Sequence, residues 1–227
     1  MFLTKGDYFS AIEEEDLDIV VNSESVRLEA EIAAQQEIES YLRQRFDVAQ
    51  LFLDVNLFVY GAAYVVDDNV FIDAEDWDSS VTYSINDLVV RDKKVYFANT
   101  GNTNKDPLTE SEWTFIGNQY QVFTCTADNT NVFPNDTSKW GSDPRKKILV
   151  RYHVDIALYE LHSRVSPRNI PTYRIDRRDD AINWLKSVAD PRKNITPDFP
   201  LIVHDENKGN DISWNSAPQF GNANDLW

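Results

Sequence analysis

Several residue types are scarce in this chain of 227 residues, and each scarcity excludes a class of protein. The single cysteine, Cys125, cannot form an internal disulfide, and its apolar, strand-like surroundings favour a buried thiol over a nucleophile. There are three histidines, and His153 and His162 lie nine residues apart, on opposite sides of a helix. With 7 glycines the chain has no glycine-rich phosphate loop, and HExxH and paired CxxC motifs are absent. We therefore expect neither catalysis nor a bound cofactor or metal.

Long apolar runs are also missing. No stretch approaches the roughly eighteen apolar residues that a membrane-spanning helix needs. The first residues, MFLTKGDYFS, lack the basic segment and apolar core of a secretory signal. We expect a protein of a reducing cytoplasm, or of a particle assembled there, without membrane contact.

Positive charge is scarce as well, with 22 Lys and Arg against 38 Asp and Glu and a formal net charge of −16. The acidic excess lies in 1–46 and 47–142, whereas 143–190 holds 10 basic and 7 acidic side chains. Nucleic-acid binding depends on cations that contact phosphate, so we expect no specific DNA binding, although such a chain can surround DNA. A plain solvated acidic surface is the alternative. The stretch DAEDWDSS (73–80) is interpreted as an acidic loop, with weak Ca²⁺ binding as its alternative.

Apolar residues at helical spacing predict four helices. Their ranges are 4–12, 23–46, 143–164 and 175–189, separated by an acidic connector at 13–22 and a loop at 165–174. The residues expected to cap their starts are Thr4 with Asp7, Ser23 or Ser25, and Asp143 followed by Pro144. The side chains expected to point inward are Leu28, Ile32, Ile38, Leu42 and Phe46, then Ile148, Tyr152, Ile156 and Tyr159, then Ile182, Leu185 and Val188.

Between the long helices the apolar pattern changes to alternation, which is typical of strands. We expect hairpins at 54–77 and at 87–99, the second turning at Asp92-Lys93, and a strand at 119–127. The segment 47–142 is therefore predicted to be a small β insert that stands where a short connection between two helices would otherwise lie. Surface loops accept such insertions at little entropic cost.

The insert contains an internal repeat. The stretches VYFANTGNTNKDPLTESEW (95–113) and QVFTCTADNTNVFPNDTSKW (121–140) share an aromatic strand, an Asn/Thr-rich loop, a proline and a tryptophan in the same order. Pro107 precedes Pro134 by the same 27 residues that separate Trp113 from Trp140. We interpret this spacing as a partial duplication of one unit.

The last segment, 191–227, is poor in aliphatic residues and has no regular period. It contains Trp214, Phe220 and Trp227 in polar surroundings, as docking segments that order on binding do. Together these patterns predict an α+β fold: a small helical bundle in two parts, 1–46 and 143–190, a β-rich insert and an extended C-terminal tail.

The helices resemble those of head–tail connector proteins, also called adaptor or head-completion proteins, of tailed bacteriophages. The resemblance lies in IESYLRQRF, VRYHVDIALYELHSR and RRDDAINWLKSVA, and it covers 1–46 and 143–227. It implies a structural virion protein, assembled in the host cytoplasm, that forms a homo-oligomeric ring of twelve copies on the portal. Other tail or ring proteins would be further partners, and DNA would pass through the channel during packaging and ejection. The large insert suggests a crAss-like short-tailed phage.

Cations gather where helices begin, a position that the helix dipole disfavours. These residues, Arg145, Lys146, Lys147, Arg151, Arg177 and Arg178, are our candidates for the ring interface. The expected partner is the acidic segment 1–46 of a neighbouring copy, because head-to-tail contacts close into rings. Ordinary surface charge is the alternative.

The insert resembles the chitin-type carbohydrate-binding modules of chitinases. The residues that carry this resemblance include Trp77, Tyr83, Tyr96 and Trp113 over about forty residues. They are expected to form the core of the module, a platform for a glycan, or contacts to other proteins of a particle. The alternative function for the whole chain is accordingly a glycan-binding module on a helical carrier.

Overall fold

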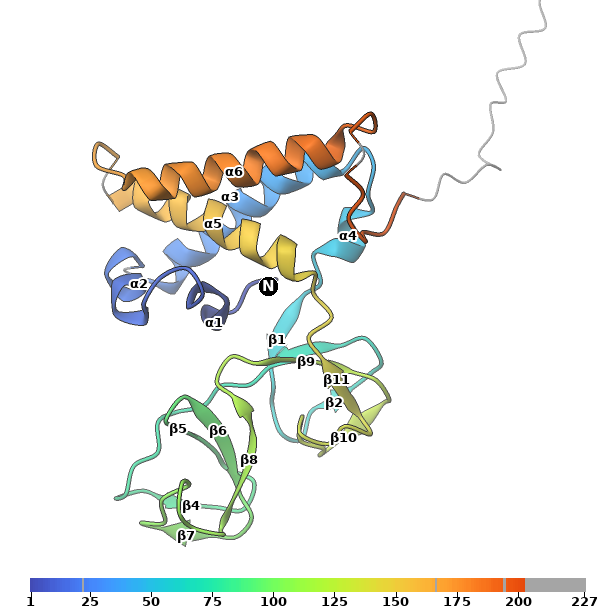
Figure 1. The fold of residues 1–227 in the computed structure, drawn as a ribbon. Helices are drawn as coiled ribbons and strands as arrows, with labels where there is room; N and C mark the ends of the chain where they lie inside the picture. The colour runs from blue at the N-terminus through green and yellow to red at the C-terminus, as the bar shows by residue number, and fades with distance from the viewer. Residues whose placement is uncertain (22, 166, 194, 203–227) are drawn as a thin grey trace, which may run out of the picture.

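The computed structural model describes residues 1–202, except 22, 166 and 194. Its fold is α+β, with a helical bundle at one end and two small β units at the other (Figure 1). The expected docking residues Trp214, Phe220 and Trp227 lie outside the described residues. In the described part of the chain, no helix is both long and apolar enough to cross a membrane.

Three long helices form the bundle, and shorter helices lie beside them in the chain. The helices are α1 (Lys5–Tyr8), α2 (Glu14–Val20), α3 (Glu24–Leu42), α4 (Val48–Leu51), α5 (Lys147–Val165) and α6 (Thr172–Ala189). Two expected caps are present. Thr4 and Asp7 form a capping box at the start of α1, and the Ser23 hydroxyl accepts a hydrogen bond from the backbone of Val26 at the start of α3.

Three expected helix boundaries were wrong. The segment 13–22, expected as a connector, contains α2, because Leu17 and Val20 find apolar partners in the bundle. The helix expected at 143–164 does not begin directly after Asp143, whose carboxylate instead accepts hydrogen bonds from Arg145. It begins at Lys147. The last helix begins at Thr172, three residues earlier than expected and directly after Pro171. Proline has no backbone N–H, but a residue at the start of a helix donates no hydrogen bond within the helix, so none is lost.

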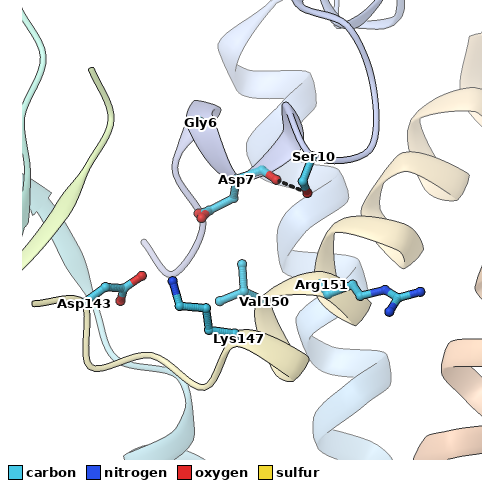
Figure 2. Close-up of a pocket in the computed structure, with 7 residues that line it drawn as sticks. All are labelled: Gly6, Asp7, Ser10, Asp143, Lys147, Val150 and Arg151. Carbon is cyan, nitrogen blue, oxygen red and sulfur yellow. Dashed lines mark hydrogen bonds between the residues drawn. The ribbon is translucent and has the colours of Figure 1, made fainter. Parts of the chain in front are cut away.

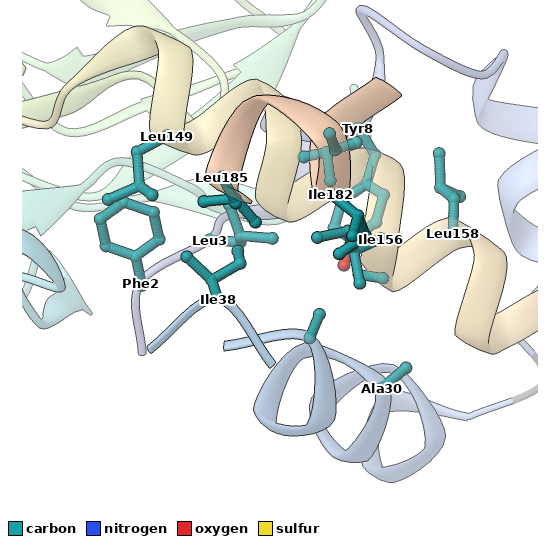
Figure 3. Close-up of a cluster of buried hydrophobic side chains, with 14 of the residues drawn as sticks. Phe2, Leu3, Tyr8, Ala30, Ile38, Leu149, Ile156, Leu158, Ile182 and Leu185 are labelled. Carbon is teal, nitrogen blue, oxygen red and sulfur yellow. The ribbon is translucent and has the colours of Figure 1, made fainter. Parts of the chain in front are cut away.

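The bundle core lies between α3, α5 and α6, with the N-terminal segment packed against it (Figure 3). Ile182, Leu185 and Val188 of α6 point inward as predicted. The inward face of α3 differs from the prediction, since Ile32 is 56% exposed and Ala30 and Ala34 are buried. The small side chains leave room for α5 to approach closely, which apolar periodicity alone does not weigh.

On α5 the expected inward residues are buried to different degrees. Ile156 is fully buried, Ile148 and Tyr152 pack against the core from its edge, and Tyr159 is half-buried.

The boundary between the bundle and the insert also differs from the prediction. Leu51 of α4 belongs to the bundle core, and so does Phe199, which packs edge-on against Phe46. The insert therefore begins after Phe52. The segment after α6 is docked as far as Ile202, whose backbone N–H donates to the carbonyl of Arg45.

The β insert consists of two units. The proximal unit, 54–74 with 119–142, joins the bundle. It holds a sheet of strands β1 (Val55–Leu57), β3 (Asn69–Phe71), β9 (Val122–Cys125) and β11 (Trp140–Ser142), plus the pair β2 (Ala63–Tyr64) and β10 (Asn129–Thr130). The distal unit, 75–118, holds the sheet β5 (Leu88–Arg91), β6 (Lys94–Ala98) and β8 (Trp113–Asn118), plus the pair β4 (Thr82–Tyr83) and β7 (Asn102–Thr103).

The predicted strands of the insert are partly correct. The hairpin of β5 and β6 turns at Asp92 and Lys93, both with positive φ as a two-residue hairpin turn requires, and β9 lies within the expected 119–127 strand. The hairpin expected at 54–77 was wrong. β1 runs parallel to β3, and the intervening β2 pairs with β10 far along the chain.

Apart from β1, the strands of the two units have the same topology, and the distal unit is inserted in the proximal one. In the proximal unit β9 lies between β3 and β11, and β2 pairs with β10. In the distal unit β6 lies between β5 and β8, and β4 pairs with β7. The whole distal unit occupies the connection between β3 and β9, where the distal unit itself has only the tight turn between β5 and β6.

Matching hydrogen bonds extend this equivalence to single residues. The indole N–H of Trp113 donates to the carbonyl of Lys105 (2.9 Å), and that of Trp140 donates to Val132 (3.2 Å), eight residues earlier in each case. Each tryptophan meets a tyrosine edge-on. These pairs are Tyr83–Trp113 and Tyr64–Trp140, with ring centroids 5.2 and 5.1 Å apart. The segments 95–113 and 121–140 thus occupy equivalent places, and the equivalence also includes 58–72 and 77–91.

Candidate functional site

A cleft of about 250 Å³ lies between α1 and the start of α5 (Figure 2). Its lining residues are Gly6, Asp7, Ser10, Asp143, Lys147, Val150 and Arg151. Residues 119–122 of the proximal unit and Asn118 of the distal unit border a second hollow that shares Asp7 and Lys147 with it. The cleft therefore lies where the bundle meets the insert. Two residues expected as helix caps, Asp7 and Asp143, line it together with two interface candidates, Lys147 and Arg151.

Arg145 lies beneath this cleft and is 5% exposed. Its guanidinium donates to the carboxylates of Asp7 (2.7 and 3.0 Å) and Asp143 (2.9 and 3.0 Å) and to the carbonyl of Phe2 (2.7 Å). Burial opposes the charged form, but these carboxylates outweigh it and raise the pKa of Arg145. This burial and these partners disfavour the interface role expected for Arg145. The side chain fastens the N-terminal segment to the start of α5 in its own chain.

Three other interface candidates also have partners within the chain. Arg178 pairs with Glu37 of α3 (2.8 Å), and Arg177 pairs with the buried Asp155 (3.2 Å). Lys146 reaches Asp198 (2.7 Å) in the segment after α6. The acidic partner that we expected from a neighbouring copy is, for Arg178, supplied by the same chain.

Lys147 and Arg151 are different. Within the described ranges Lys147 makes no ion pair, and Arg151, 64% exposed, comes no closer than 4.0 Å to Asp155. They lie four residues apart on α5, with Val150 beside them (Figure 2). We call Lys147, Val150 and Arg151 the cationic cleft. It is the part of the predicted basic surface that remains available to another molecule.

An acidic surface lies on α2. Lys5 binds Glu14 (3.3 Å) and Asp18 (3.2 Å), which fixes this helix to α1. Glu15 and Asp16 are exposed and make no ion pair among the described residues, and Ile19 beside them is 74% exposed. We call Glu15, Asp16 and Ile19 the acidic face. They occupy neighbouring positions on the side of α2 away from the core.

A buried polar network, not anticipated from the sequence, holds the bundle together behind these surfaces. The Glu31 carboxylate accepts hydrogen bonds from Tyr8 (2.9 Å) and from Arg27, and the His153 ring bonds to the Glu31 carbonyl (2.9 Å). Burial raises the pKa of Glu31 to about 7 and lowers the pKa of His153 to about 4. The signal in the sequence was the (i, i+4) spacing of Arg27 and Glu31.

The aromatic residues proposed for a glycan platform lie in the distal unit. Tyr83, Tyr96 and Trp113 are buried and form its core with Val89 and Ala98. Trp77 is half-buried at the edge of this core. The Arg91 guanidinium lies 5.1 Å from the centre of its ring and pairs with Asp106 (3.1 Å). This burial favours the core-packing alternative over a sugar platform, because stacking on a sugar needs an exposed ring face.

The remaining candidate chemistry is weak. Cys125 is buried in the proximal unit, and burial raises the pKa of its thiol, which disfavours the reactive thiolate. In the acidic loop 73–80, the Asp78 carboxylate accepts hydrogen bonds from the backbone and hydroxyl of Ser80. Across the part of the chain that the structure describes, no three His, Cys, Asp or Glu side chains are placed to hold a metal ion.

Comparisons with known proteins add no relative: no family model, curated protein or solved structure matches the chain.

Proposed function

We propose that the chain is a structural virion protein, a head–tail connector subunit that forms a ring on the portal of a tailed bacteriophage. The observation that carries the proposal is the presence of two separate charged surfaces without close partners among the described residues. These surfaces, the cationic cleft and the acidic face, lie on one tightly packed bundle. Such surfaces fit a protein that repeats one contact around a ring. The resemblance of the segments in α3, α5 and α6 to phage connector proteins names the kind of ring.

The charge of the chain suits a DNA channel. A net charge of −16 in every copy would give the assembly a negative potential, and twelve copies would repel phosphate from the channel wall. DNA would then move through during packaging and ejection without being held. The β units lie at the end of the molecule that is opposite α6 (Figure 1). At that end they would contact other tail or ring proteins.

Electron microscopy of the portal tests this proposal. The portal protein for this test is the one encoded near the gene for this chain, because the genes for the portal and the major capsid protein are expected there. Purified portal mixed with the chain should show an added ring of density on the tail side, in images that portal alone does not give. Portal particles without that ring, at concentrations of the chain well above those of the portal, would contradict the proposal.

A further inference from the structure

The cationic cleft and the acidic face are complementary in charge and in apolar content. We propose that the acidic face of one copy sits in the cationic cleft of the next copy in the ring. This inference rests on the proposed ring and names its subunit contact. The occupant of the cleft is thus a second copy of this chain, presented through α2.

Charge decides how two copies can meet. Glu15 and Asp16 would repel the same pair on another copy, and Lys147 and Arg151 would do likewise. Neither surface can therefore form a two-fold symmetric contact with itself. Only the contact of one surface with the other is attractive. A contact between two different surfaces can repeat head to tail, and it closes into a ring where the rotation between neighbouring copies allows.

Apolar contact adds to the attraction. Ile19 is 74% exposed at the centre of the acidic face, and Val150 is half-buried between the two cations of the cleft. Placing one against the other removes apolar surface from water at the middle of a charged rim, which is how many interfaces are built.

Both surfaces are already rigid. Leu17 and Val20 anchor α2 in the core, and Lys5 holds its charged side through Glu14 and Asp18. The cleft is fixed by Arg145 beneath it, through Asp7 of α1. Little conformational entropy is lost on docking, so exposed charges of modest individual strength are sufficient when a ring repeats them.

Charge reversal on the full chain tests the contact. One variant carries K147E and R151E, and a second carries E15K and D16K. Each alone should self-associate about tenfold more weakly per contact, in sedimentation velocity and on portal particles in electron microscopy. Mixed in equal amounts, the two variants should assemble again, because every contact in an alternating ring is then complementary.

The matched control is the double reversal R168E and K186E at exposed positions outside both surfaces, which changes the net charge by the same amount as K147E and R151E. It should assemble like the unchanged chain, and thermal melts should show that all variants fold. Rings formed equally well by both single-surface variants would overturn this contact and leave the ring itself intact. An unchanged chain that stays monomeric alone and on the portal would overturn the proposed function, and this contact with it.

Discussion

At the scale of single residues, buried charge organises the region around the cleft. Arg145 satisfies two carboxylates and a backbone carbonyl at once, and it joins segments that are 138 residues apart in the chain. Its fixed, planar array of donors suits such a junction better than the flexible ammonium of a lysine.

We predict that R145A destabilises the protein by about 2 to 3 kcal/mol, because Asp7 and Asp143 lose their charge-assisted hydrogen bonds. Urea denaturation followed by circular dichroism measures this change. K147A removes an exposed neighbour and serves as the control, with an expected effect within about 0.5 kcal/mol. Equal stability of the two variants would show that Arg145 is not the anchor of this region.

The network of Glu31 and His153 predicts two opposed dependences of stability on pH. His153 has a pKa of about 4 in the folded protein and 6.5 when unfolded, so its contribution is present above pH 6.5 and lost as pH falls toward 4. Glu31 has a pKa of about 7 in the folded protein and 4.5 when unfolded, so its contribution is present below pH 4.5 and lost as pH rises through 7. Between about pH 4.5 and 6.5 the two cancel.

Removing one member should uncover the other. Relative to the unchanged protein, E31Q should lose stability as pH falls from 6.5 to 4.5, by roughly 1 kcal/mol or more for each pH unit. H153Q should instead lose stability as pH rises from 4.5 to 7. Urea midpoints across this range give both slopes, and parallel curves for the three proteins would contradict the assignment.

A single glycine sets the approach of insert to bundle. A Cβ atom on Gly6 would lie 2.6 Å from the Cβ of Tyr120, which belongs to the turn that faces α1 from the proximal unit. We predict that G6V opens this junction and costs about 1 to 3 kcal/mol. Limited proteolysis should then cut near residues 53 and 142. G101A, whose added Cβ meets only ordinary contacts, should leave the cleavage pattern unchanged.

At the scale of elements, the bundle and the β units have separate cores. The bundle core draws only on residues up to Phe52 and from Ile148 onward. Within the insert the separation is incomplete, because Val90, Val95 and Ile116 of the distal sheet complete the core of the proximal unit. One face of that sheet thus serves the distal core and the other face serves the proximal core.

Replacing 54–140 by a short polar linker should therefore leave the bundle folded. We expect helical circular dichroism and cooperative unfolding to persist, because the replacement removes only contacts at the edge of the bundle. These include the packing of Phe9 against Tyr120 and the ion pair of Glu14 with Lys93. The same replacement combined with L185A, which removes a fully buried side chain of α6, is the reference for a damaged bundle. Loss of the helical signal without L185A would show that the insert is part of the bundle's core.

At the scale of the whole molecule, the proposed function needs attachment to the portal as well as ring closure. The sequence assigns this attachment to Trp214, Phe220 and Trp227, which lie beyond the described residues. We predict that alanine at all three positions abolishes co-sedimentation with portal particles and leaves the melting temperature of the chain unchanged. Binding at full strength by this variant would move the attachment to the bundle or the β units.

The sequence by itself determined the helical bundle, the place of the insert, the turn at Asp92 and Lys93 and the repeated pattern that ends in Trp113 and Trp140. These features depend on local periodicity and turn chemistry, which a chain segment carries with it wherever it lies. Local signals also located Thr4 and Ser23 as caps.

Only the tertiary structure decided which side chains are available. It buried Arg145 against Asp7, turned Ile32 of α3 outward, paired β2 with β10 and placed the distal unit inside the proximal one. Each of these outcomes depends on partners far apart in the chain, and a charge or an apolar side chain has the same local pattern whether or not such a partner exists. For the same reason the sequence pattern predicts one basic surface of six cations. In the structure, by contrast, Lys147 and Arg151 are the two that remain without close partners among the described residues.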